Sequence, residues 1–157
     1  PGNETDSFLL LGDGQRLSLA QLKGAQNLFG GVELLTLSAC DTANGGSGTD
    51  GKEVEGFAVL AQRQGAKAVI ASLWPVADRS TRLLMQRFYQ LRNAQAGTPK
   101  AEALRQAQIA LLRGTATDNM ASTQRGIGVD VIKSTNLGAT FAHPYFWAPF
   151  ILIGNWR

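Results

Sequence analysis

Two short apolar runs, with a helical pattern between them, restrict the fold of this chain more than any other feature. Each run is bounded by glycine or turn residues, and their length and apolar content predict two buried strands, Val32–Ala39 and Ala68–Leu73. Residues 52–64 have helical spacing and are followed by Gly65, which favours a helix stop. Strands joined by a helix pair in parallel, because the crossover returns the chain to the end of the sheet where the first strand started.

Local turn and capping signals predict the elements on either side of this unit. Asp13-Gly14 is a hairpin turn pair, and Ser18 with Gln21 has the spacing of a capping box. Two helices are predicted next, one capped by Asp78 or Ser80 and one that begins at Thr98-Pro99. A long loop over 114–140 follows, and the chain closes with a last strand, Phe146–Ile153, in which Pro149 indicates an edge or a bulge. This order predicts one domain, residues 1–157, of the α/β class, with a mostly parallel sheet flanked by helices on both faces.

The composition excludes several classes of protein. Of the 157 residues, 44% are hydrophobic and 17% are charged, which is not the composition of a disordered chain. A net charge of +3 without a basic run gives no ground for nucleic-acid binding, and no apolar run reaches the roughly 20 residues of a membrane helix. One cysteine excludes an internal disulfide framework and a multi-cysteine zinc site, and it favours a reducing, cytoplasmic location.

A ligand site is expected at the carboxyl ends of the two predicted strands, where ligands of α/β sheets bind. Cys40 leaves the first strand and enters a glycine-rich loop, a position that presents a nucleophile, although a lone cysteine is also a common core residue. Beyond the second strand, Trp74 and Asp78 indicate a pocket in which the Asp78 carboxylate selects a basic substrate side chain. Asp41 and Glu55 are further acidic residues near the strand ends. The alternatives are helix capping or first-turn charge for Asp78 and Glu55, and packing for Trp74.

His143 is the only histidine of the chain, and a cysteine nucleophile needs a nearby base. It lies in an aromatic run just before the predicted last strand. A packing or backbone-bonding role is favoured there over a catalytic one.

The loop Gly46–Lys52 spells the start of a P-loop, G-x-x-x-x-G-K, and residues 46–51 also spell G-x-G-x-x-G. Both motifs hold phosphate with backbone N–H groups at a helix N-terminus. However, Glu53 stands where a P-loop has Ser or Thr, and Asp50 adds negative charge. Phosphate or nucleotide binding is therefore the weaker alternative.

Four motifs, taken together and in this order, resemble the CHAT domain, a caspase-like domain often joined to TPR repeats in bacterial proteins. They are S-A-C-x-T around Cys40, V-E-G-F-A at 54–58, A-V-I-A-S-L-W-P-V at 68–76 and H-P-Y-F-W-A-P-F at 143–150. The resemblance runs from about Phe8 to the C-terminus and implies a caspase–separase fold. It also implies a cysteine endopeptidase with a Cys–His dyad that cleaves proteins or peptides without a metal or an organic cofactor.

The resemblance assigns roles to particular residues. Cys40 matches the family nucleophile, and Asp78 lies in a segment similar to one that binds a basic P1 side chain in the related separases. The family's histidine precedes its cysteine, by about 50 residues in caspases, so we expect the N-terminal part of the domain, with the base, to be missing and this chain alone to be inactive. A missing strand leaves a sheet edge that favours self-association. The alternative is a non-catalytic caspase-like scaffold that assembles TPR domains or signalling partners.

Overall fold

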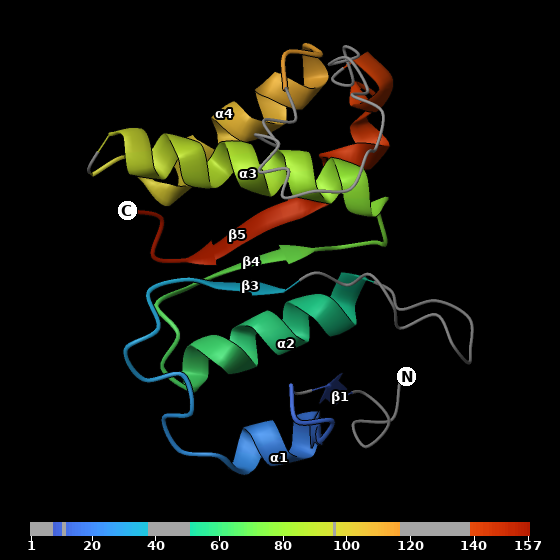
Figure 1. Cartoon of the computed structure of the whole chain (residues 1–157). Coiled ribbons are helices and arrows are strands. Elements are labelled where there is room, and N and C mark those ends of the chain that lie inside the picture. The colour runs from blue at the N-terminus through green and yellow to red at the C-terminus, as the bar shows by residue number, and fades with distance from the viewer. Residues whose placement is uncertain (1–7, 11, 38–50, 96, 117–138) are drawn as a thin grey trace, which may run out of the picture. The chain divides into compact units, whose positions relative to one another are not determined.

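The structure, a computed structural model, describes residues 8–10, 12–37, 51–95, 97–116 and 139–157. They belong to two compact units, one holding the chain up to Pro75 with residues 149–156, the other holding residues 76–148 with Arg157. The first unit contains, in chain order, β1 (Phe8–Leu10), β2 (Arg16–Ser18), α1 (Leu19–Gly24), β3 (Leu35–Leu37), α2 (Gly51–Arg63), β4 (Ala68–Ser72) and β5 (Phe150–Gly154) (Figure 1). The second unit contains α3 (Asp78–Ala94), α4 (Lys100–Leu112) and the short 3-10 helices η1 (Ala139–Phe141) and η2 (Pro144–Phe146).

The predicted hairpin and capping box are both present. β1 and β2 pair in antiparallel register across a turn in which Gly14 has a φ of 82°. The Asp13 carboxylate accepts a hydrogen bond of 2.9 Å from the Gln15 N–H, which closes the turn locally. At the start of α1, Gln21 N–H donates to Ser18 Oγ and Ser18 N–H donates to the Gln21 side chain, at 3.1 and 2.8 Å.

The main sheet has the strand order β3-β4-β5 in the part of the chain that the structure describes. β3 and β4 are parallel, as expected for strands joined by α2, whereas β5 runs antiparallel to β4 with Phe150 opposite Ser72. The α/β class is thus confirmed, and the described sheet is mixed, with one parallel and one antiparallel pair. All five residues of β4 are buried, which explains why that strand reads as a continuous apolar run.

The last strand begins later than its apolar run predicts. β5 starts at Phe150, whereas Phe146, the first residue of the predicted strand, is the last residue of η2. Pro149 has no N–H to donate and precedes the strand, while its carbonyl accepts a hydrogen bond of 3.0 Å from the Leu73 N–H. Proline therefore marks the start of this edge strand and does not interrupt it.

The core of the first unit forms between α2 and the sheet. Ala58 and Ala61 of α2 are fully buried beside Val69 of β4, and the half-buried side chains packed on them are Phe29, Leu35, Leu37 and Ile153. Small side chains at these two helical positions let α2 lie close to the strands. On its other side α2 contacts α1 (Figure 1). Gly65, with a φ of 102°, follows the helix as predicted.

In the second unit α3 and α4 pack together. The apolar face predicted for α4 is confirmed, because all five of its members are buried: Ala103, Leu104, Ala107, Ala110 and Leu111. Leu84 and Phe88 of α3 are fully buried, at 0% exposure.

The predicted side-chain caps of α3 and α4 are wrong. Ala77 and Pro99 occupy the N-cap positions, and neither helix has a capping hydrogen bond from a side chain. Ser80 Oγ instead donates back to the Ala77 carbonyl at 2.7 Å, and Thr98 Oγ1 donates to the Gln95 carbonyl at 2.9 Å. Thr98 thus closes the turn before α4, and Ser80 bonds back within the first turn of α3, since a Ser or Thr side chain can bond either to the amides ahead or to a carbonyl behind.

Candidate functional site

The parallel register of β3 and β4 determines where the predicted site lies. Leu37 pairs with Ala71, so the carboxyl ends of both strands lie at the same edge of the sheet. Cys40 follows Leu37 by three residues in the sequence, and Trp74 follows Ala71 by three. The chain segments that carry the predicted nucleophile and the predicted pocket wall therefore leave neighbouring strands at one edge, as expected for an α/β ligand site.

Several predicted site residues lie outside the described ranges. Cys40 and Asp41 are among them, and so is most of the loop Gly46–Lys52; of that loop only Gly51 and Lys52 are described, as the start of α2. The nucleophile and the phosphate-loop alternative therefore stay predictions. What the structure adds is the strand pair β3–β4, whose first strand precedes Cys40 in the sequence and whose β4 member is fully buried.

Trp74 and Asp78 are described, each in its own unit. Trp74 is half-buried, two residues beyond the end of β4. Asp78 is exposed and is the first residue of α3, where its charge is favourable to the helix dipole, but it is not the N-cap. Because the Asp78 carboxylate does not accept a capping hydrogen bond, it can bind a ligand. The pocket predicted for these two residues stays a prediction.

His143 caps η2. Its Nδ1 accepts a hydrogen bond of 3.2 Å from the Tyr145 N–H, and Pro144 is the first residue of the 3-10 helix. The predicted backbone-bonding role of His143 is thereby confirmed. Since Nδ1 accepts, a neutral ring carries its proton on Nε2. A neutral imidazole bound in this way has no second free nitrogen to take a proton from a thiol.

Lys100 and Glu102, two ionisable groups on α4, were missed by sequence reasoning. Lys100, at 3% exposure, is buried at the start of α4, and its Nζ donates to the main-chain carbonyl of Arg157. Its position, three residues before Ala103 and four before Leu104, lies on the apolar face of α4 and was the available signal. The hydrogen bond satisfies one donor of a group that is expensive to bury.

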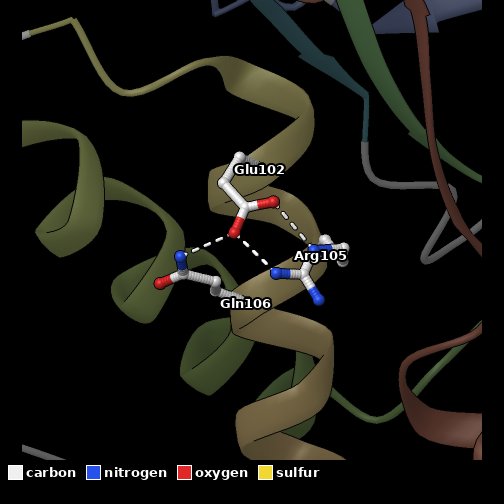
Figure 2. A network of polar contacts seen from close by, with 3 residues as sticks. All are labelled: Glu102, Arg105 and Gln106. Carbon is white, nitrogen blue, oxygen red and sulfur yellow. Dashed lines mark hydrogen bonds and ion pairs between the residues drawn. The ribbon is translucent and has the colours of Figure 1, made fainter.

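Glu102 forms a local polar network on the same helix (Figure 2). Arg105 donates to both of its carboxylate oxygens, at 2.6 and 2.8 Å, and the Gln106 side chain donates at 2.7 Å. The hydrogen bonds from Arg105, followed by that from Gln106, lower the pKa of Glu102 from its ordinary value of 4.5 to about 2. The same pairing raises the pKa of Arg105. The i, i+3, i+4 spacing of these residues would have predicted the network.

A shallow pocket of about 250 Å³ lies at the turn between α3 and α4, within the second unit. Its lining consists of polar and turn residues: Gln95, Gly97, Thr98, Pro99, Glu102 and Gln106. None of the predicted site residues belongs to it. Because both Glu102 oxygens already accept hydrogen bonds, this pocket presents no free charged group to a ligand.

In the part of the chain that the structure describes, no three side chains of the metal-binding types His, Cys, Asp and Glu come together. Within the same residues, no helix has the length and apolarity needed to cross a membrane.

The mixed sheet with its packed helices defines an α/β protein whose architecture is consistent with a fragment of a caspase-like domain. The family described as the CHAT domain matches residues 1–155 of the chain, so the chain belongs to the CHAT domain family and the resemblance is confirmed. The chain is also 31% identical over 124 residues to Tetratricopeptide repeat protein 28 of Mus musculus. This match covers 79% of the chain but only 4% of that protein's length. No solved structure gives a significant match.

Proposed function

We propose that this chain supplies the nucleophile and part of the substrate pocket of a cysteine endopeptidase. The observation that carries the proposal is the parallel register of Leu37 with Ala71. In this register the strands that precede Cys40 and Trp74 in the sequence end at the same edge of the sheet. Membership of the CHAT domain family, which is caspase-like and related to peptidases, supports the proposal that this edge carries peptidase chemistry. Cys40 is the nucleophile because it is the only cysteine and because it follows a strand supported by a buried neighbour.

The general base is a histidine outside this chain. His143 is the only histidine present, and its Nδ1 is engaged as the cap of η2. In the reaction, the upstream base takes the Cys40 thiol proton and the sulfur attacks the peptide carbonyl carbon. The oxyanion is bound by the Cys40 N–H and, as the family resemblance implies, by the N–H of a glycine near the base. The amine leaves with the proton from the histidine, and water then hydrolyses the thioester.

Asp78 is proposed to select a basic P1 side chain. It is exposed and its carboxylate is not used as a helix cap, so it keeps its charge for a ligand. Pairing with Arg or Lys would discriminate against neutral P1 residues. Trp74, half-buried beyond β4, is proposed as an apolar wall for the aliphatic part of that side chain.

The test requires a longer version of the protein that extends upstream by about 60 residues, enough to include a histidine about 50 residues before Cys40. A peptide library is digested and the cleavage sites are read by mass spectrometry. We expect cleavage after Arg or Lys by the extended protein and none by its Cys40→Ala variant or by the present chain. Cleavage by the Cys40→Ala variant would refute the proposed nucleophile.

The P1 assignment has its own variant. Asp78→Asn should lower kcat/KM for Arg and Lys sites by about tenfold or more, with a smaller effect on neutral sites. Asp13→Asn is the matched control, since Asp13 is an exposed aspartate in the β1–β2 turn and asparagine supports the same turn. Equal losses in the two variants would exclude Asp78 as the P1 determinant.

The competing function is a non-catalytic scaffold. The relative named for tetratricopeptide repeats is the observation that favours it, because repeats of this kind stack into extended surfaces that bind partners. If the extended protein cleaves nothing in the library, with or without its cellular partners, while it still folds, the scaffold replaces the peptidase.

A further inference from the structure

The segment that holds α3 and α4 has a higher net positive charge than the chain as a whole. Between Val76 and Ala116 the structure describes seven positive and two negative side chains, a net of +5, whereas the whole chain has a net charge of only +3. The positive residues are Arg79, Arg82, Arg87, Arg92, Lys100, Arg105 and Arg113, and the negative ones are Asp78 and Glu102. One of those two carboxylates, Glu102, is already committed to Arg105 and Gln106. This described part of the second unit therefore has a net positive charge.

Part of this charge lies along one stripe of α3. Arg79, Arg82, Gln86, Tyr89 and Asn93 are separated by alternate steps of three and four residues, so they line one side of the helix over about 21 Å. Four of the five are exposed and Gln86 is half-buried. The buried residues Ser80, Leu84 and Phe88 occupy the opposite side. We call the five residues the α3 stripe.

The stripe has two chemically different halves. Its first half carries two guanidinium groups, and its second half is uncharged. Tyr89, in that second half, is 45% exposed, and its ring is set edge-to-face on Phe88 at 5.0 Å between centroids. Exposed tyrosines are typical of protein contact surfaces. Alternate steps of three and four are also the spacing at which one helix packs along another.

We propose that the α3 stripe docks an acidic helix of a protein partner, with carboxylates opposite Arg79 and Arg82 and neutral side chains opposite Tyr89. The positive charge of the stripe favours a partner with acidic side chains. The spacing of the stripe along α3 favours a partner segment that is helical. Nucleic acid fits less well, because phosphates recur at even spacing and would leave half of the stripe without a charge partner. This inference is independent of the peptidase proposal, since the stripe contains neither Cys40 nor Asp78.

The test measures binding of the full chain to fluorescent helical peptides by anisotropy. The probe is an alanine-based peptide of about 21 Å or more in helical length, with glutamates at alternate three- and four-residue steps along one face. A peptide of equal composition, with its glutamates spread round the helix, reports non-specific attraction. We expect the aligned peptide to bind at least about fivefold more tightly at about 0.05 M NaCl, and the difference to disappear at about 0.5 M.

Two substitutions on the same helix separate the stripe from overall charge. Arg79→Glu should weaken binding of the aligned peptide by about fivefold or more, and Arg79→Gln should do so by less. Arg87→Glu is the matched control, because Arg87 is exposed on α3 but lies outside the stripe, and it should change binding by less than about twofold. Circular dichroism of each variant confirms that the helices are retained.

Three results would overturn the proposal. They are the absence of binding to the aligned peptide, equal losses for Arg79→Glu and Arg87→Glu in folded protein, and tighter binding to a single-stranded RNA or an anionic vesicle than to the peptide. The last result would assign the positive charge to a different class of partner.

Discussion

Leu37 of β3 lies opposite Ala71 of β4 in parallel register, and this pair fixes the edge from which both predicted site segments leave the sheet. Ala71 is fully buried and Leu37 is half-buried against the α2 core. The position of the end of β3 thus depends on packing against β4 and α2. Changes in the β4 core should therefore affect both stability and any chemistry at that edge.

Ile70→Ala should strongly destabilise the protein. Ile70 is fully buried in the central strand, and deleting its side chain removes apolar contacts and leaves a cavity, for an expected loss of about 2–5 kcal/mol. Urea unfolding followed by circular dichroism gives the change in the free energy of unfolding. Leu28→Ala is the control, since Leu28 is 49% exposed and its loss should stay below about 0.5 kcal/mol. Equal losses in both variants would contradict the described core.

Gly154→Ala should destabilise by about 1–3 kcal/mol or more. Gly154, at the end of β5, has a φ of 96°, and an added Cβ would lie 2.6 Å from the Lys67 carbonyl oxygen, a main-chain atom that cannot turn away. Gly24→Ala is a matched control because a Cβ there meets nothing within 4 Å. Thermal unfolding of both variants gives the comparison. A Gly154→Ala variant as stable as Gly24→Ala would mean that the Lys67–Gly154 approach is wrong.

His143→Ala should lower stability by about 1 kcal/mol, whereas His143→Asn should restore most of that loss. Asparagine can accept the Tyr145 N–H as the imidazole does, but alanine cannot. Both variants of the extended protein should keep the peptidase activity of the parent, because the proposed base lies elsewhere. Loss of cleavage in a stable His143→Asn protein would identify His143 as the base instead.

The Glu102 network should make stability depend on acid pH. The pKa of Glu102 is lowered to about 2 by its hydrogen bonds with Arg105 and Gln106, so its stabilising effect is fully present above about pH 4.5 and is lost as the pH falls through about 2. Glu102→Gln removes the charge, and the difference in Tm between parent and variant should shrink as the pH falls below 4.5. High salt should reduce the difference at neutral pH, because the Glu102 side chain is 37% exposed and the pair is therefore screened by ions. Parallel pH curves for parent and variant would contradict the pairing.

Local signals in the sequence predicted the local structure well. The Ser18–Gln21 capping box, the Asp13-Gly14 turn and the Gly65 stop each depend on residues only a few positions apart, and each is present as expected. The prediction of the apolar face of α4 was also correct, because apolar residues recur along the sequence with the helical period of 3.6 residues. The same period included Lys100, whose burial was overlooked because lysine is ordinarily exposed.

These signals left two features of the fold open. Thr98 and Ser80 have the chemistry of helix caps, yet each hydroxyl donates to a carbonyl behind it, and a sequence cannot choose between two local partners of similar energy. The direction of β5 was likewise open, because an apolar strand can join a sheet either way and only the route of the preceding chain decides.

The sequence by itself determined the strands, helices and turns of this protein and its membership of the CHAT domain family, since these depend on the order and period of residues along the chain. Only the tertiary structure decided that β3 and β4 end at one edge in the Leu37–Ala71 register and that His143 is bound to the main chain. The reason is physical: register and hydrogen-bond partners are selected among competing contacts by packing between distant segments, and that selection is not encoded in any single segment.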